Sequence, residues 1–275
     1  MKTNQLWDAE SLPSPWAPST TAKADGHDDD DDADEQEPPW FVLGLNPGWN
    51  CSDDHQEALD FLLHSASAGS PTTTRIVGFC ATLDYSKLHD RQLHLTRAWC
   101  TCKAAMEANL PIQLRLLPAC KDAAHKDNAE SPYAILMSDV EGLLDKITET
   151  NAETQVHLSR WSGHADTMNH LLDRFPKNVW IGIDGTVTFQ KATRAHECAF
   201  DVPLDRLLLE TGTTIPSQVA LKLGRDAFVH GGWIPFVAES IARCKKDAMM
   251  TADVVARVAS QNTNQVYGLG ALTNE

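Results

Sequence analysis

Short apolar runs alternate with longer amphipathic stretches along most of the chain, and this alternation limits the possible folds more than any other feature. The apolar runs predict strands near residues 40–46, 75–81, 111–117, 154–159, 178–183 and 206–210. The stretches between and after them predict helices near 53–67, 90–108, 134–149, 164–174, 188–199, 233–246 and 252–261. Strands that alternate with helices are typical of βα units around a parallel sheet. The sequence therefore predicts an α/β fold, and 275 residues suffice for one barrel-sized domain with a substantial core.

Residues 203–212 read Pro-Leu-Asp-Arg-Leu-Leu-Leu-Glu-Thr-Gly, and this segment closely resembles a motif of the TatD-like metal-dependent hydrolases, a (β/α)-barrel family of DNases. In the family motif the same residues are followed by an aspartate that binds metal. Further segments resemble the family in the same order along the chain. They are residues 43–49, 76–85, 109–115, 161–163, 180–185 and 262–268.

The resemblance implies a TIM-barrel-like (β/α) parallel barrel of the metal-dependent hydrolase type over residues 40–270. It also implies metal-dependent cleavage of phosphodiester bonds in DNA, with zinc, magnesium or manganese as the ion. The opening Asp-x-His-x-His strand of the family has no counterpart in the residues before Trp40. We therefore expect a barrel in which the first two strands are missing.

The aligned metal-ligand positions have all changed. Asn46 stands where the family has a histidine, Phe79 (or the adjacent Cys80) where it has a bridging glutamate, and Gly212 where it has the aspartate. Arg115 and Ser159 each replace a further histidine. Functional groups of such barrels lie at the C-terminal ends of the strands, so these positions should line one mouth.

These replacements predict that the family's metal site is lost. Phe79 has no ligand atom, Gly212 has no side chain, and Arg115 is a permanent cation that would repel a divalent ion. Hydrolysis with two metal ions needs carboxylates and imidazoles to hold the ions. We therefore expect a pseudoenzyme without a cofactor, and a divalent metal only if the family activity is retained.

His157 and Glu210 are the remaining candidates for chemistry at this mouth. His157 lies two residues before Ser159, so on a strand the two side chains point to the same face. His157 could replace the lost histidine ligand, or it could be a histidine of the barrel interior. Glu210 keeps the family residue, and two arrangements are open for it. It could form a salt bridge with Arg115, or each could be solvated separately at the rim.

The acidic charge is concentrated before the predicted barrel. Residues 1–39 hold eleven Asp and Glu against two Lys, which gives −9 of the chain's net charge of −15. Such a dense run of like charges predicts a disordered tail, which could solubilise the protein or dock a basic partner. The remaining residues are also net acidic, so they offer no general attraction to phosphate backbones.

Two functions remain open at this point. The first is a metal-dependent DNase with DNA as its partner, and the second is a non-catalytic scaffold that binds an unknown protein through the barrel and the tail. Seven cysteines without a framework spacing predict free thiols in a reducing compartment. With neither a secretory signal nor a membrane span in the sequence, we expect a cytoplasmic or nuclear protein.

Overall fold

The computed structural model describes residues 40–44, 75–84, 90–117, 132–212, 215–224 and 229–269. All of them belong to one compact unit, Pro38–Glu275. The helix predicted over 53–67, the site position Asn46 and the acidic segment 1–39 lie outside the described residues.

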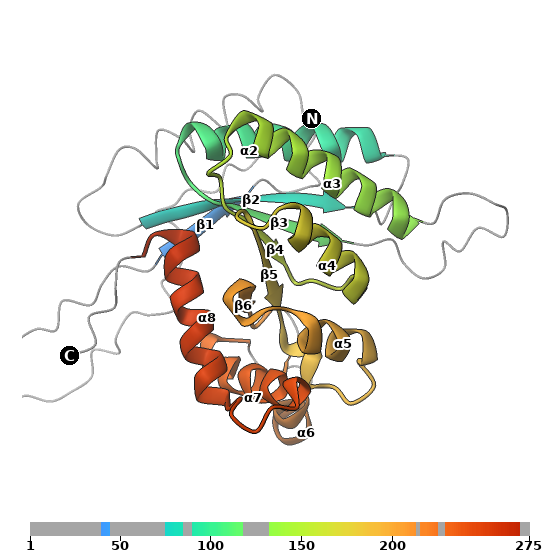
Figure 1. Ribbon diagram of the computed structural model, residues 1–275, viewed down its shortest axis with the longest axis vertical. Coiled ribbons are helices and arrows are strands. Elements are labelled where there is room, and N and C mark those ends of the chain that lie inside the picture. Colours follow the sequence, from blue (N-terminus) through green and yellow to red (C-terminus); the bar gives the residue numbers. More distant parts are fainter. Residues whose placement is uncertain are drawn as a thin grey trace, which may run out of the picture. The chain divides into compact units, whose positions relative to one another are not determined.

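The described strands form one parallel sheet in which each strand pairs with the strand before it in the sequence (Figure 1). All six predicted strands are present, and β2 continues three residues beyond the predicted end. Their bounds are Trp40–Gly44 for β1, Arg75–Asp84 for β2, Ile112–Leu117 for β3, Val156–Ser159 for β4, Val179–Ile183 for β5 and Leu207–Leu209 for β6. The parallel order confirms the predicted α/β class.

Helices connect the strands and follow the last one. The α-helices are α2 (Arg91–Glu107), α3 (Pro132–Thr150), α4 (Ala165–Arg174), α5 (Thr193–Asp201), α6 (Ser217–Leu223), α7 (Ile234–Lys245) and α8 (Ala252–Tyr267). Short 3₁₀ helices cover Gly185–Thr188 (η4), Leu204–Arg206 (η5) and Gly231–Trp233 (η6). None of the described helices is long and apolar enough to cross a membrane.

Two predicted helices need correction, and one helix was missed. The helix predicted over 188–199 begins only at Thr193, because the Asp184 side chain accepts a hydrogen bond from the Thr186 N–H and starts the separate turn η4. The prediction missed α6, whose seven residues are too few for a clear apolar periodicity. α8 continues to Tyr267, beyond the predicted end at 261, because the Asn262 side chain bonds the carbonyls of Leu204 and Leu207 and docks the helix.

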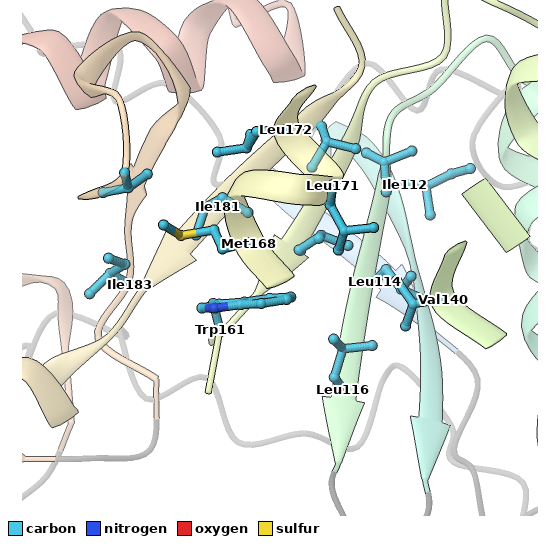
Figure 2. Close-up of a cluster of buried hydrophobic side chains, with 14 of the residues drawn as sticks. Ile112, Leu114, Leu116, Val140, Trp161, Met168, Leu171, Leu172, Ile181 and Ile183 are labelled. Carbon is cyan, nitrogen blue, oxygen red and sulfur yellow. The ribbon is translucent and has the colours of Figure 1, made fainter. Parts of the chain in front are cut away.

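Alternate residues of each strand point to opposite faces of the sheet. We call the face that carries the main core the outer face, and the opposite one the inner face. On this outer face Ile112, Leu114 and Leu116 of β3 are buried beneath the helices (Figure 2). Val140 of α3 and Met168 of α4 belong to the same cluster (Figure 2). Burying such large apolar side chains contributes about 1.5–3 kcal/mol each, so this face provides most of the apolar stabilisation.

Phe79 belongs to this outer face and not to the mouth. Its side chain is fully buried in the main core, and in the β2–β3 ladder it pairs with Ile112. The prediction that Phe79 lines the mouth was therefore wrong. Its neighbour Cys80 pairs with Gln113 and so points to the opposite, inner face.

A smaller apolar cluster lies on the inner face. Trp180 of β5, Leu208 of β6 and Val266 of α8 pack together, with Tyr267 against them. The indole N–H of Trp180 donates to Gln155 Oε1 at 2.7 Å, and the guanidinium of Arg206 lies 5.0 Å from the ring centroid. α8 therefore covers part of the inner face, on the opposite side of the sheet from the main core.

Candidate functional site

Glu210, the first residue after β6, is the centre of a buried polar network. Its N–H continues the ladder by donating to the Ile183 carbonyl, so its side chain falls on the inner face with that of Leu208. Its Oε1 accepts from the Ser159 hydroxyl at 2.7 Å, and its Oε2 accepts from the Arg160 N–H at 2.6 Å. Both carboxylate oxygens are thus engaged by the end of β4.

His157 approaches the same carboxylate. Its Nε2 lies 3.1 Å from Glu210 Oε1, within ion-pair distance, but the two atoms are not aligned for a hydrogen bond. We therefore treat the contact as an electrostatic attraction that is strong when the imidazole is protonated. His157 and Ser159 reach the same side chain, as expected for two positions of a strand that share a face.

Gly182 of β5 provides the space in which this contact forms. A Cβ atom at this position would lie 2.4 Å from His157 Nε2 and 2.7 Å from Glu210 Cδ. Real Cβ atoms do not approach other heavy atoms so closely. The missing side chain at 182 is therefore a condition for the His157–Glu210 contact.

Tyr267, at the last position of α8, holds the other nitrogen of the imidazole. Its hydroxyl lies 2.7 Å from His157 Nδ1. Burial raises the pKa of the Tyr267 phenol, and the charge of Glu210 raises it further, so the phenol stays neutral. It can donate to a neutral imidazole or accept from a protonated one, and in both states it fixes the ring.

Arg160 joins Glu210 to a second carboxylate. Its Nε lies 3.2 Å from Asp184 Oδ2, while its own N–H is the group that binds Glu210. The residue has a φ of +53°, a left-handed conformation that is uncommon for residues other than glycine. This backbone geometry directs the amide and the guanidinium of one residue to two different carboxylates. We call His157, Ser159, Arg160, Asp184 and Glu210 the polar cluster.

Asp184 also occupies the space beside Gly212. Gly212 has a φ of +59°, and a Cβ atom there would lie 2.5 Å from Asp184 Oδ2. The carboxylate of Asp184 therefore fills the position where a side chain at 212 would begin.

The predicted salt bridge between Arg115 and Glu210 was wrong. Among the described residues, Glu210 has the three partners given above, and neither a hydrogen bond nor an ion pair links it to Arg115. Separate solvation of Glu210 at the rim is also wrong, because hydrogen bonds hold its carboxylate within the network. Arg115 lies on the inner face of β3, in register with Thr82 of β2 and Ser159 of β4.

The polar cluster makes stability depend on pH. Burial alone would raise the pKa of the Glu210 carboxyl, but the charge of His157 and the hydrogen bonds from Ser159 and Arg160 outweigh it and hold this pKa below its ordinary value of 4.5. A carboxyl with a lowered folded-state pKa contributes stability above its unfolded-state pKa and loses it as the pH falls through the folded-state value.

We therefore expect the difference in free energy of unfolding between wild type and Glu210→Gln to be constant at and above neutral pH. It should shrink as the pH falls below 4.5, the ordinary value of this carboxyl. Urea unfolding of both proteins across this range measures the difference. If the difference in free energy of unfolding stays constant under acidic conditions, the carboxylate charge is not what stabilises the cluster.

A cavity of about 530 Å³ lies away from the polar cluster, between η4, α5, α6 and α7. Its walls include Val187, Phe200 and Cys244, and Arg243 and Lys246 lie at its edge. Arg243 already pairs with Glu239, and the Lys246 ammonium lies 5.7 Å from the Phe200 ring centroid. The chemistry that the sequence predicts lies instead on the inner face of the sheet.

The sequence profile of the family described as TatD related DNase matches residues 40–268. The chain belongs to the TatD family. This is a family of metal-dependent hydrolases that includes nucleases, and the match spans all six described strands.

Individual relatives agree with this assignment. The human 3'-5' RNA nuclease TATDN2 is 27% identical over 117 residues, which are 42% of this chain and 15% of that protein. The uncharacterized metal-dependent hydrolase YabD of Bacillus subtilis is 28% identical over 90 residues, 33% of each chain. The matched segments thus span at most a third of these relatives' own length.

The crystal structure of YjjV, a TatD homologue from Escherichia coli K12, superposes with a TM-score of 0.56 at 20% identity, over 83% of this chain and 76% of that chain. This similarity confirms the TIM-barrel-like fold of the TatD family. In the part of the family match that the structure describes, no group of three or more His, Cys, Asp or Glu side chains is placed to hold a metal ion.

Sequence reasoning missed two members of the polar cluster and the tyrosine that contacts it. Arg160, Asp184 and Tyr267 were not singled out, although Asp184 and Tyr267 both lie in segments that resemble the family. The signal for Asp184 was its place directly after a buried strand, where functional groups of such barrels gather. Tyr267 and His157 are 110 residues apart, and no local pattern connects them.

Proposed function

We propose that this TatD-family chain is a non-hydrolytic member, in which the polar cluster stands in place of a metal centre and the barrel acts by binding a partner. The observation that carries the proposal is the double role of Arg160. Its N–H binds Glu210 and its guanidinium pairs with Asp184, so one residue engages both carboxylates that the fold brings together. A cation from the chain itself thus provides the positive charge that a metal ion would bring.

The donor atoms present do not suit a divalent ion. Such an ion needs carboxylates or imidazoles with lone pairs directed at it. Both oxygens of Glu210 accept hydrogen bonds, and Asp184 accepts from the Thr186 N–H as well as facing Arg160. Gly212 offers no side-chain donor. Binding a metal here would require breaking the network, and no hydrolytic step is assigned to it.

Binding of a partner is favoured over cleavage because the framework is kept while the donor positions have changed. The family match covers the sheet and its helices, so the framework on which a partner would bind is kept. By its sequence, the acidic segment 1–39 would add attraction for a partner with a basic surface. The alternative is the family activity, metal-dependent phosphodiester hydrolysis of nucleic acid with an unrecognised ligand set.

Elemental analysis of the purified full-length chain tests the proposal. Wild type and Glu210→Gln are incubated with excess zinc, manganese or magnesium, desalted and analysed for bound metal, and both are assayed on single-stranded and duplex DNA and on RNA. Gln keeps the shape of the side chain and removes its charge, and circular dichroism checks that the variant is folded. We expect equal metal contents and equal background cleavage in the two proteins.

The comparison with Glu210→Gln also separates cations held loosely by the acidic segment from a true centre, because both proteins keep that segment. One or two equivalents of metal in wild type that are lost in the variant, together with nuclease activity that is lost with them, would overturn the proposal in favour of the family reaction.

A further inference from the structure

Arg115 is a cation on the inner face, and the described residues include no counter-ion that pairs with it. Its side chain is partly buried, and its Nε is buried without a hydrogen-bond acceptor among these residues. Within the described part of the chain, no hydrogen bond or ion pair involves its guanidinium. Buried polar atoms of native proteins nearly always have a partner, and an unpaired charge is the most costly exception.

Several other arginines of the described chain have partners. Arg91 binds Asp139 at 2.6 Å, Arg174 binds Asp145 at 2.8 Å, and Arg160 pairs with Asp184. Arg206 stacks on the ring of Trp180. Arg115 differs from these four arginines because none of the described residues forms a hydrogen bond or an ion pair with its guanidinium.

The groups around Arg115 do not supply the missing anion. Glu210 is engaged by its own partners, and Gln113 Nε2 donates to the Ser159 hydroxyl at 3.3 Å. Cys80 and Asp84 are the ionisable side chains on the same face of β2. Asp84 has an interaction of its own, and among the described residues neither a hydrogen bond nor an ion pair links it to Arg115. Burial raises the pKa of the Cys80 thiol despite the opposing effects of Thr82 and Arg115, so the thiol stays neutral.

The side chains of Arg115 and Thr82 lie side by side. Arg115 and Thr82 are register partners on adjacent parallel strands, so their side chains leave the inner face next to each other. A guanidinium presents two parallel N–H groups to one acceptor group, and a hydroxyl beside it can add a third donor. Planar carboxylates and tetrahedral phosphates can accept hydrogen bonds from donors in this arrangement.

We propose that Arg115 and Thr82 form a binding site for an oxyanion supplied from outside the chain, either a phosphate group or a carboxylate. The inference rests on the proposed function, because a metal ion at the polar cluster would compete with Arg115 for the same anion. It adds to that function the chemistry of one contact with the partner. An anionic group of the partner would bind on the inner face, at β2 and β3.

Isothermal titration calorimetry of the full-length protein at constant ionic strength tests the site. Inorganic phosphate, a nucleoside 5′-monophosphate and acetate are the three probes, and they distinguish free phosphate, a nucleotide phosphate and a carboxylate as sources. We expect wild type to bind at least one of them in the millimolar range or tighter. Arg115→Gln should weaken that binding at least about tenfold, since the charge-assisted pair of hydrogen bonds is lost.

Two further variants make the result specific. Arg243→Gln removes the same charge from an exposed position of α7 and should leave anion binding unchanged. Arg115→Lys keeps the charge, loses the planar pair of donors and should bind with intermediate affinity, which also covers the case in which Arg115→Gln fails to fold.

Wild type that binds none of the three probes would overturn the inference, as would equal binding by wild type and Arg115→Gln. These outcomes are separate from those of the metal analysis. A metal bound through Glu210 would defeat the proposed function whatever the anion titration shows. Anion binding that depends on Arg115 in metal-free protein supports both proposals.

Discussion

Replacing Glu210 with alanine will lower the free energy of unfolding by about 3–6 kcal/mol, because two buried donors lose a charged acceptor and each such hydrogen bond contributes about 1.5–3 kcal/mol. The substitution leaves the Ser159 hydroxyl and the Arg160 N–H without their acceptor, and it removes the carboxylate beside His157 Nε2. It also opens a void beside Gly182, where the carboxylate now lies. We expect the effect to be the largest of any single substitution of a charged residue in the described chain.

Urea unfolding at neutral pH, followed by circular dichroism, measures this loss. Glu239→Ala is the matched control, because Glu239 pairs with Arg243 four residues later on the exposed face of α7. Pairs of that kind contribute only about 0.3–0.5 kcal/mol. A loss for Glu210→Ala no greater than that of the control would mean that the polar cluster does not hold the sheet together, and its interpretation as a structural substitute for metal would fail.

Gly212→Asp, which restores the residue of the family motif, will destabilise the protein and will not create a metal site. The left-handed φ of +59° at Gly212 is unfavourable for any side chain, by about 1–2 kcal/mol. The new Cβ would also meet Asp184 Oδ2 at 2.5 Å, and a second carboxylate would be forced against the first. Overpacking of this kind costs about 1–3 kcal/mol more.

Gly268→Asp separates these two costs. Gly268 has nearly the same φ of +61°, but no heavy atom of the described residues lies within 4 Å of the position of its Cβ. This control should therefore show the conformational cost alone, and Gly212→Asp should be less stable than it in urea unfolding. If both variants lose equal stability, the crowding by Asp184 is absent. If Gly212→Asp instead gains stability on addition of manganese or zinc, the position is still able to hold metal.

Strand positions could be predicted from the sequence because each strand is a short segment whose outer-face residues are apolar and buried. The same periodicity correctly predicted that His157 and Ser159 share a face, and both side chains reach Glu210. The end of α8 could not be found in this way. The predicted helix ended at 261, but the Asn262 amide is buried against the carbonyls of Leu204, the first residue of η5, and Leu207, which follows η5.

The polar cluster depends on contacts that no local pattern encodes. Arg160 acts through a left-handed backbone conformation directly after β4. No glycine stands at this position to indicate such a conformation in the sequence. The pairing of Arg115 with Glu210 was a reasonable expectation from charge alone. It was wrong because the Ser159 hydroxyl and the Arg160 N–H, at the end of β4, donate to both oxygens of the Glu210 carboxylate.

The position of α8 has a consequence for how the chain is made. The strands pair in the order of their synthesis, so the ladder can extend while the ribosome is still adding residues. Val266 and Tyr267, which cover Trp180 and hold His157, are nearly the last described residues to be translated. In a nascent chain, Trp180 therefore stays uncovered by α8, and the His157 imidazole lacks its Tyr267 partner, until α8 has left the exit tunnel.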